Sequence, residues 1–447
     1  MDRRQLPSVD KFVTSLGSWP LPRSVVTEVA RSVIDQARDG KLDGTGDLET
    51  EATAILSRLV RTRLRTVINA TGVILHTNLG RAPLAAEAAR AAYEVSAGYT
   101  NIELDTDTGH RGRRGRFLLE LLADLTGAED ALVVNNNAGA LTLTLSAIAT
   151  GREVVVSRGE LIEIGGAYRL PSIIAAGGAF LVEVGTTNRT RLADYRSAIS
   201  EKTAALLKVH TSNYQVVGFT EEARLADLVT LGLETGTPTV FDQGSGLLDE
   251  RAGWMAGGAP AWLAGEPGVS QGVAAGADLV LFSGDKLFGG PQAGVIVGRS
   301  EVISSLARHP LARALRVDGA TIAALTATAS MYADGRGSEI PVWQMATVTP
   351  AELEIRAQRV VDEVGRPNLT IESGTSVLGA GSVPGAGVPS PVIIIAGKPD
   401  RVFAALLAGE PPVLARREAG RVAVDLRAIP PADDDRLAQA LSAACRS

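Results

Sequence analysis

Short apolar runs alternate with longer amphipathic segments between residue 66 and about residue 335. The segments between the runs, such as 138–151 and 221–236, carry apolar residues at helical spacing. A strand that is buried on both faces reads as a continuous apolar run, and helices between such strands connect parallel neighbours. The pattern therefore predicts an α/β fold with a mainly parallel sheet covered by helices on both faces. The predicted strands are 131–134, 152–157, 179–185, 204–210, 238–244, 277–284 and 293–298.

The two ends of the chain follow different patterns. Residues 1–65 contain helical periodicity at 27–40 and 48–65, with 11 Lys and Arg against 9 Asp and Glu. The last part combines apolar runs at 391–397 and 421–429 with helical patterns near 401–409 and 433–445. We therefore expect a small N-terminal helical domain at 1–65, a large α/β domain at 66–335 and a small C-terminal α+β domain at 336–447.

Composition narrows the possible classes of protein. The formal charge of −6 argues against a surface coated with positive charge, so contact with nucleic acid would need a local basic patch. Arg58, Arg61, Arg63 and Arg65 make one end of the N-terminal segment basic, although a solvated helix face is the more usual explanation of such a cluster. The single cysteine excludes a disulfide framework and a cysteine metal cluster, and we expect no metal. No apolar run approaches the length of a membrane helix, and the N-terminus has no signal sequence, so we expect a cytoplasmic protein.

Polar side chains follow several of the predicted strands. Asn136, Asn137 and Ala138 come after 131–134 and open a helix, where small residues and free amides favour a phosphate group. His210 ends the strand at 204–210, and its flat ring could lie against a heteroaromatic ring. Asp242 lies near the end of the strand at 238–244, where a carboxylate could pair with a protonated ring nitrogen. Ligands of parallel sheets bind at these strand ends.

A lysine follows the next strand. Ser283 ends the run at 277–284, and Lys286 stands in the glycine-rich turn after it. Pyridoxal phosphate requires a lysine for its aldehyde, a phosphate site and an acidic partner for its ring nitrogen. Each residue alone has a common structural explanation. A lysine in a glycine-rich turn is usually solvated, an aspartate at a strand end is often a cap, and a histidine beside an apolar run is usually part of the core. Together they predict pyridoxal phosphate held by Lys286, Asp242, His210, Ser283, Asn136, Asn137 and Ala138.

Arginines form a second group of candidates. Arg81 lies in the segment 76–83, four more arginines lie within 110–117, and Arg313 and Arg316 lie in 309–318. Arg313 and Arg316 are three residues apart, so on a helix they would share one face. Guanidinium groups gathered in this way suit a second phosphate-like anion, although surface arginines that cover the core fit the pattern as well.

The motifs as a set resemble the bacterial selenocysteine synthases, the L-seryl-tRNA(Sec) selenium transferases. The resemblance covers nearly the whole chain and is more specific than a single motif. The segments that carry it are 68–82, 133–140, 154–171, 183–190, 208–220, 282–298 and 309–318.

The resemblance implies a fold of the type I class of pyridoxal phosphate enzymes, an N-terminal domain that binds tRNA, and a homodecamer built from dimers. It implies that Lys286 is the cofactor lysine, that Arg81, Arg313 and Arg316 hold the selenium donor selenophosphate, and that Asp285 takes part in catalysis. The implied reaction is loss of the hydroxyl from serine on tRNA(Sec), followed by addition of selenium to the aminoacrylyl group that remains.

Two positions depart from the family pattern. Gln243 stands where leucine is usual between Asp242 and Gly244, and Gly319 stands where lysine is usual after Asp318. Neither change removes a proposed catalytic group, but both leave room for altered substrate preference. Two alternatives stay open at this stage: a pyridoxal phosphate lyase that acts on a small amino acid or an amino-sugar phosphate, and a tRNA-binding protein without catalytic activity.

Overall fold

The computed structural model describes residues 6–42, 47–164, 168–379 and 381–446, and it divides into two compact units, Met1–Thr66 and Val67–Ser447. The first unit consists of helices that pack their apolar faces together. Its core includes Phe12, Val33, Ile34 and Leu56, and the side chain of Asp47 caps the third helix. The helices of this unit are α1 (Val9–Ser15), α2 (Arg23–Arg38) and α3 (Leu48–Arg61).

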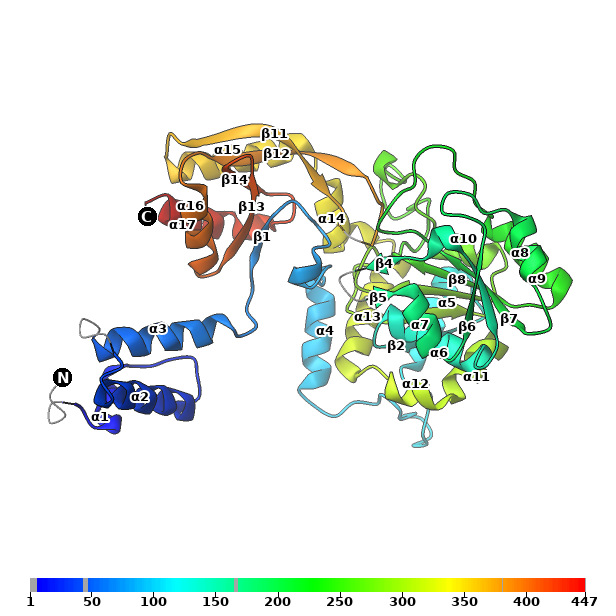
Figure 1. The fold of residues 1–447 in the computed structure, drawn as a ribbon, viewed down its shortest axis with the longest axis horizontal. Helices are drawn as coiled ribbons and strands as arrows, with labels where there is room; N and C mark the ends of the chain where they lie inside the picture. The colour runs from blue at the N-terminus through cyan, green and yellow to red at the C-terminus, as the bar shows by residue number, and fades with distance from the viewer. Residues whose placement is uncertain (1–5, 43–46, 165–167, 380, 447) are drawn as a thin grey trace. The chain divides into compact units, whose positions relative to one another are not determined.

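The second unit is built on a seven-stranded sheet with the strand order β2-β10-β9-β8-β7-β3-β6 (Figure 1). Among the described strands of this sheet, β10 alone runs antiparallel to its neighbours, β2 and β9. Every apolar run predicted as a strand of this sheet forms one, so the prediction of a mainly parallel sheet is confirmed. The strands are β2 (Asp130–Val134), β3 (Glu153–Ser157), β6 (Phe180–Val184), β7 (Thr203–Val209), β8 (Thr239–Gly244), β9 (Leu279–Ser283) and β10 (Gly294–Gly298).

Alternate residues of these strands are buried on opposite faces of the sheet. In β9, Leu279 and Leu281 belong to one apolar cluster, whereas Val280 and Phe282 belong to another. Helices α6, α7 and α11 contribute to the cluster of Leu279, and α5 and α13 contribute to the cluster of Val280. The helices of this part are α4 (Ala86–Ser96), α5 (Arg116–Thr126), α6 (Asn137–Ile148), α7 (Leu170–Ala176), α8 (Leu192–Ala198), α9 (Leu225–Thr235), α10 (Val269–Ala274), α11 (Ser300–Arg308), α12 (Pro310–Ala314), α13 (Gly319–Ala333) and α14 (Pro341–Thr347). A short hairpin, β4 (Glu163–Ile164) and β5 (Tyr168–Arg169), lies outside the large sheet.

A second sheet of five strands, with the order β1-β13-β14-β12-β11, packs against three helices (Figure 1). It takes in β1, which lies just after the N-terminal unit in sequence and pairs in parallel with β13. The chain therefore passes through this smaller sheet before it enters the larger one. The elements are β1 (Ile68–Ala70), β11 (Leu369–Val377), β12 (Gly387–Ile395), β13 (Val413–Glu418), β14 (Arg421–Asp425), α15 (Pro350–Val364), α16 (Pro399–Ala408) and α17 (Asp434–Arg446).

The arrangement of the large sheet determines where a site can form. Since β2 and β9 are both antiparallel to β10, they run in the same direction as β8, β7 and β3. The carboxyl ends of β2, β7, β8 and β9 therefore meet at one edge. None of the helices in the described part of the chain is long and apolar enough to span a membrane.

Candidate functional site

A cavity of about 590 Å³ lies at the carboxyl edge of the large sheet. Residues that follow β2, β7 and β9 contribute to its wall, together with Asp242 of β8 and a segment near residue 80. It brings together every residue that the sequence predicts to bind the cofactor, along with one of the predicted arginines. These residues are Asn136, Asn137, Ala138, His210, Asp242, Ser283, Lys286 and Arg81.

Lys286 is buried in the turn after β9. Its side chain is enclosed by Gly381, where an added Cβ would lie 2.6 Å from the lysine Nζ. Gly381 also has a φ of +89°, so a larger residue there would be strained and would displace the amine. Burial, helped by the nearby charge of Arg81, lowers the pKa of Lys286 to about 8. About a tenth of the amine is therefore neutral and nucleophilic at pH 7, far more than for an ordinary lysine.

Asp242 is buried in β8 on the same wall. Its Oδ1 accepts a hydrogen bond of 2.8 Å from Nδ2 of Asn137, and its carbonyl oxygen accepts the backbone N–H of His210. Burial raises the pKa of the Asp242 carboxyl, while Asn137, Lys286 and His210 lower it. A cation or a protonated ring nitrogen placed against this carboxylate would therefore be bound favourably.

Asp285 connects two of the candidates. Its Oδ2 lies 2.6 Å from Nη1 of Arg81, and its Oδ1 accepts a 2.7 Å hydrogen bond from the Ser283 hydroxyl. Arg81 adopts a φ of +64°, and the adjacent Ala82 N–H donates to the Asp285 carbonyl. The buried carboxylate thus holds the arginine side chain at the cavity while its backbone holds the turn.

The start of α6 forms another part of the wall. The side chain of Asn136 caps the helix by accepting the Gly139 N–H at 2.8 Å. β10 approaches this turn so closely that a Cβ on Gly294 would lie 2.1 Å from the Asn136 carbonyl oxygen. The sequence predicts that the backbone N–H groups at Asn136, Asn137 and Ala138 serve a phosphate, and the side chain of Asn137, which contacts Asp242, leaves them free to do so. An anion at this turn would meet the amide groups of the first helical turn.

Glu266 is a buried residue of the site that sequence reasoning missed. Its Oε2 lies 3.1 Å from Nε2 of His210 and accepts the Val383 N–H at 3.0 Å. The two partners are distant in sequence, and a glutamate within a Gly/Pro-rich turn is usually solvated. The local sequence therefore offers no signal for this contact.

Gln243, at a position where the resemblance leads us to expect leucine, is fully buried and has its polar groups satisfied. Its Nε2 donates to the Ser245 hydroxyl and to the Pro267 carbonyl, and its Oε1 accepts the Gly246 N–H. The residue therefore fastens the turn after β8 to the loop that carries Glu266. It does not line the cavity that contains Lys286.

Arg313 and Arg316 lie elsewhere. They line a separate cavity of about 480 Å³, and Arg316 is 3.1 Å from Glu103. The prediction that they share a helix face is wrong, because α12 ends at Ala314 and Arg316 forms a β-bridge with Val134. Leu315 is the C-cap of α12, and its carbonyl accepts the N–H of Asn135 instead of an N–H of a further helical turn. Within one chain, the predicted anion-binding arginines are thus divided between two cavities.

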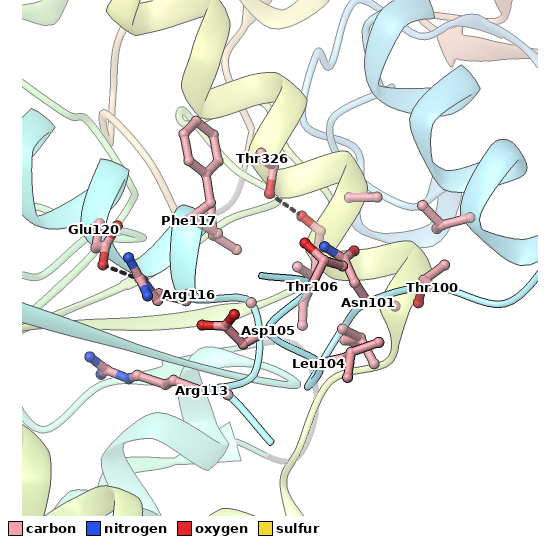
Figure 2. A pocket seen from close by; sticks show the side chains of 18 of the residues that line it. Thr100, Asn101, Leu104, Asp105, Thr106, Arg113, Arg116, Phe117, Glu120 and Thr326 are labelled. Carbon is pink, nitrogen blue, oxygen red and sulfur yellow. Dashed lines mark hydrogen bonds and ion pairs between the residues drawn. The ribbon is translucent and has the colours of Figure 1, made fainter. Parts of the chain in front are cut away.

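A third and larger cavity, of about 640 Å³, lies beside α4, α5 and α13 and is shown in Figure 2. Its wall contains Arg113 and Arg116 of the candidate arginines, but none of the residues predicted to bind the cofactor. Most charged groups there have local partners: Arg116 pairs with Glu120, as Figure 2 shows. Arg113 pairs with Asp130, and Asp105 accepts backbone N–H groups. Since its described lining offers neither a lysine nor a histidine, this cavity does not compete with that of Lys286 as an active site.

Known proteins match this chain over nearly its whole length. The model of the family described as L-seryl-tRNA selenium transferase matches residues 67–430. The L-seryl-tRNA(Sec) selenium transferase of Solidesulfovibrio magneticus is 43% identical, and the alignment covers 99% of this chain and 98% of that protein. The protein of the same name from Carboxydothermus hydrogenoformans is 46% identical, with coverages of 95% and 94%.

A solved structure shares the fold. The structure of D-glucosaminate-6-phosphate ammonia-lyase superposes with a TM-score of 0.61 at 23% sequence identity, and it covers 88% of this chain and 98% of that one. At this level of identity the likeness concerns the fold alone. It confirms the predicted fold class, a large domain with a mainly parallel sheet joined to a small α+β domain.

Proposed function

The chain belongs to the L-seryl-tRNA selenium transferase family, and from this premise we propose that it converts L-seryl-tRNA(Sec) into L-selenocysteinyl-tRNA(Sec) with selenophosphate as donor. The single observation that carries the proposal is the shared cavity of Lys286, Asp242 and Arg81. A buried amine, a buried carboxylate and an anion-binding guanidinium are the groups that this exchange of hydroxyl for selenium requires.

Pyridoxal phosphate fits this cavity. Asp242 offers a buried carboxylate for its ring nitrogen, Lys286 offers an amine for its aldehyde, and the first turn of α6 offers amide groups for its phosphate. The buried Oδ1 of Asn137 has no hydrogen-bond partner among the described residues, which leaves an acceptor free for a donor on a ligand. When bound, the cofactor supplies an electron-withdrawing ring that stabilises negative charge at the seryl Cα.

The side chains of the cavity would divide the remaining work. The Lys286 amine, with its lowered pKa, accepts the proton from the seryl Cα and returns it there at the end. Arg81 binds an oxyanion of the donor, and Asp285 holds Arg81 in place through their partly buried ion pair. Asp242 keeps the proton on the ring nitrogen, and His210 forms the neighbouring wall.

Further parts of the proposal concern partners and location. We assign tRNA binding to the N-terminal unit, whose third helix carries Arg58 and Arg61 in its last turn.

We also propose a homodecamer built from dimers, located in the cytoplasm. Exposed apolar side chains such as Phe219 and Val217, each 87% accessible, and Phe117, 64% accessible, support contact with other copies of the chain.

The arginines support an assembly in which subunits share active sites. Arg313 and Arg316 line a cavity separate from that of Lys286 in the same chain. If these arginines bind the same donor as Arg81, they must reach it from a neighbouring subunit. We therefore propose that each active site combines the Lys286 cavity of one subunit with Arg313 and Arg316 of another.

Incubation of the purified protein with seryl-tRNA(Sec), selenophosphate and pyridoxal phosphate tests the function. We expect selenocysteinyl-tRNA(Sec), identified by the mass of its aminoacyl group. Omission of selenophosphate is the control and should abolish this product. If the protein instead turns over a small amino acid or an amino-sugar phosphate without tRNA, the lyase alternative replaces the proposal. If the protein binds seryl-tRNA but does not bind pyridoxal phosphate, the alternative of a tRNA-binding protein without catalytic activity replaces the proposal.

The lowered pKa of Lys286 predicts how capture of pyridoxal phosphate depends on pH. With a pKa of about 8, roughly a tenth of the amine is neutral at pH 7, and nearly all is neutral above pH 9. The rate of covalent capture by cofactor-free protein should therefore rise several-fold from pH 7 to 8 and level off near pH 9. Stopped-flow absorbance measures this rate. A rate that is flat from pH 7 to 9, or that is still rising beyond pH 10, would contradict a lowered pKa.

A further inference from the structure

Glu266 is a buried carboxylate beside the cavity, and its hydrogen bonds link two separate parts of the site. Its side chain is 1% exposed. Oε2 lies 3.1 Å from Nε2 of His210, in the strand-end segment after β7, and 3.0 Å from the backbone nitrogen of Val383, in the segment between β11 and β12. Oε1 is buried without a hydrogen-bond partner among the described residues. Burial of such a group is costly unless its partners are well placed.

The first contact determines the state of the His210 ring. A carboxylate oxygen can only accept a hydrogen bond, so against an ionised Glu266 the contact places a proton on Nε2 of His210. The backbone N–H of His210 donates to the Asp242 carbonyl, and this hydrogen bond fixes the position of the His210 backbone. Together the two contacts hold an imidazole of defined orientation and tautomer next to Asp242, on the wall of the cavity that contains Lys286.

The second contact reaches the cover of Lys286. Val383 lies two residues after Gly381, whose backbone is so close to the lysine that a Cβ there would lie 2.6 Å from Nζ. Val383 itself adopts a φ of +46°, a strained conformation for a β-branched residue. The hydrogen bond to Glu266 therefore holds the N–H of a strained residue in the segment that encloses the amine.

We infer that Glu266 is a positioning residue that fixes the His210 ring against the bound cofactor and ties the Val383 segment over Lys286. The inference rests on the proposed function, because it assigns His210 to the wall of the cofactor site. Glu266 itself does not line the cavity, and it acts through the two groups that it holds. Gln243 anchors the adjacent Pro267 carbonyl, so the backbone of this loop has support that is independent of the carboxylate.

Two substitutions separate this role from a merely structural one. Glu266→Ala removes both contacts, whereas Glu266→Gln keeps an oxygen that can accept from His210 and Val383. Glu250→Gln, on the exposed part of the same loop region, is the matched control. We expect Glu266→Ala to weaken pyridoxal phosphate binding by about tenfold and to shift the absorption band of the bound cofactor, while Glu266→Gln stays within about threefold of the wild type. If Glu266→Ala fails to fold, the comparison of Glu266→Gln with Glu266→Asp, whose shorter side chain cannot make both contacts, replaces it.

Combination with His210→Ala tests whether Glu266 acts through His210. In the His210→Ala background, Glu266→Ala should weaken cofactor binding by less than about threefold, because the group that it positions is already absent. An equal loss in both backgrounds would overturn this part of the inference. Hydrogen exchange of the cofactor-free protein tests the second contact. Peptides that contain Val383 should exchange faster in Glu266→Ala than in the wild type. Unchanged exchange would overturn the claim that Glu266 holds the Val383 segment over Lys286.

These outcomes also separate the inference from the proposed function. A wild-type protein that binds no pyridoxal phosphate would remove the proposed function. A wild-type protein that binds it, together with Glu266→Ala protein of unchanged affinity, spectrum and exchange, would remove the inference and leave the proposed function intact.

Discussion

Replacement of Lys286 by alanine is expected to lower the rate of selenocysteinyl-tRNA formation by about three orders of magnitude or more. The substitution removes both the amine that would hold the cofactor and the base that would move the proton at the seryl Cα. Among the described residues, no other lysine lines this cavity, so nothing there can replace it. Single-turnover measurements with seryl-tRNA(Sec) in excess selenophosphate report the rate of this step.

The fold should survive this change. The positive charge of Lys286 is disfavoured by burial, as its lowered pKa indicates, so its removal should not lower the temperature of unfolding. Lys202→Ala, at an exposed lysine just before β7, is the matched control and should keep the wild-type rate. Lys286→Ala protein that retains more than about a tenth of the wild-type rate would refute the role of the amine.

The apolar pattern of the sequence is sufficient to predict the large sheet. A strand buried on both faces needs apolar residues at nearly every position, and β7 and β9 are buried along their entire length. Parallel strands bring the residues at their carboxyl ends together at one edge. This is why the order of strands and polar residues along the chain suffices to group Asn136, His210, Asp242 and Lys286 in one site.

The apolar pattern and the strand order do not predict contacts between loop residues that are distant in sequence. Glu266 meets His210 through a loop whose path depends on Gln243, and no local pattern encodes that path. Asn137 at the start of α6 likewise binds Asp242 of β8, which lies 105 residues further along the chain. Helical spacing also fails for Arg316, because α12 ends at Ala314 and Arg316 pairs with the distant Val134 in a β-bridge.

The partly buried ion pair of Arg81 and Asp285 connects the anion-binding group to the turn that carries Lys286. Asp285 stands next to Lys286 in sequence, and its carboxylate is 2.6 Å from the guanidinium that would bind the donor. Any displacement of the Lys286 turn therefore moves the anion site as well. This coupling keeps the bound selenium donor at a constant position relative to the Lys286 amine. A reaction between two bound groups requires such fixed positions.

Mixing two inactive variants is expected to restore activity if subunits share active sites. Arg313→Ala/Arg316→Ala protein loses two guanidinium groups and should be slower than the wild type by about 10²-fold or more. Lys286→Ala protein retains these arginines but lacks the amine. After the two are unfolded and refolded together in equal amounts, or co-expressed, a site that takes Lys286 from one chain and the arginines from the other is complete. Random assembly makes roughly a quarter of the sites complete, so about a quarter of the wild-type activity should return.

A second mixture supplies the control for this experiment. Lys286 and Asp242 line the same cavity of one chain, so Lys286→Ala and Asp242→Asn proteins cannot complement each other and should stay inactive after mixing. If the arginine variant also fails to complement Lys286→Ala, although size measurements show mixed assemblies, the arginines do not act on a neighbouring subunit's site. Recovery in the first mixture alone would require that Arg313 and Arg316 cross a subunit boundary, because no rearrangement within one chain can supply both missing groups.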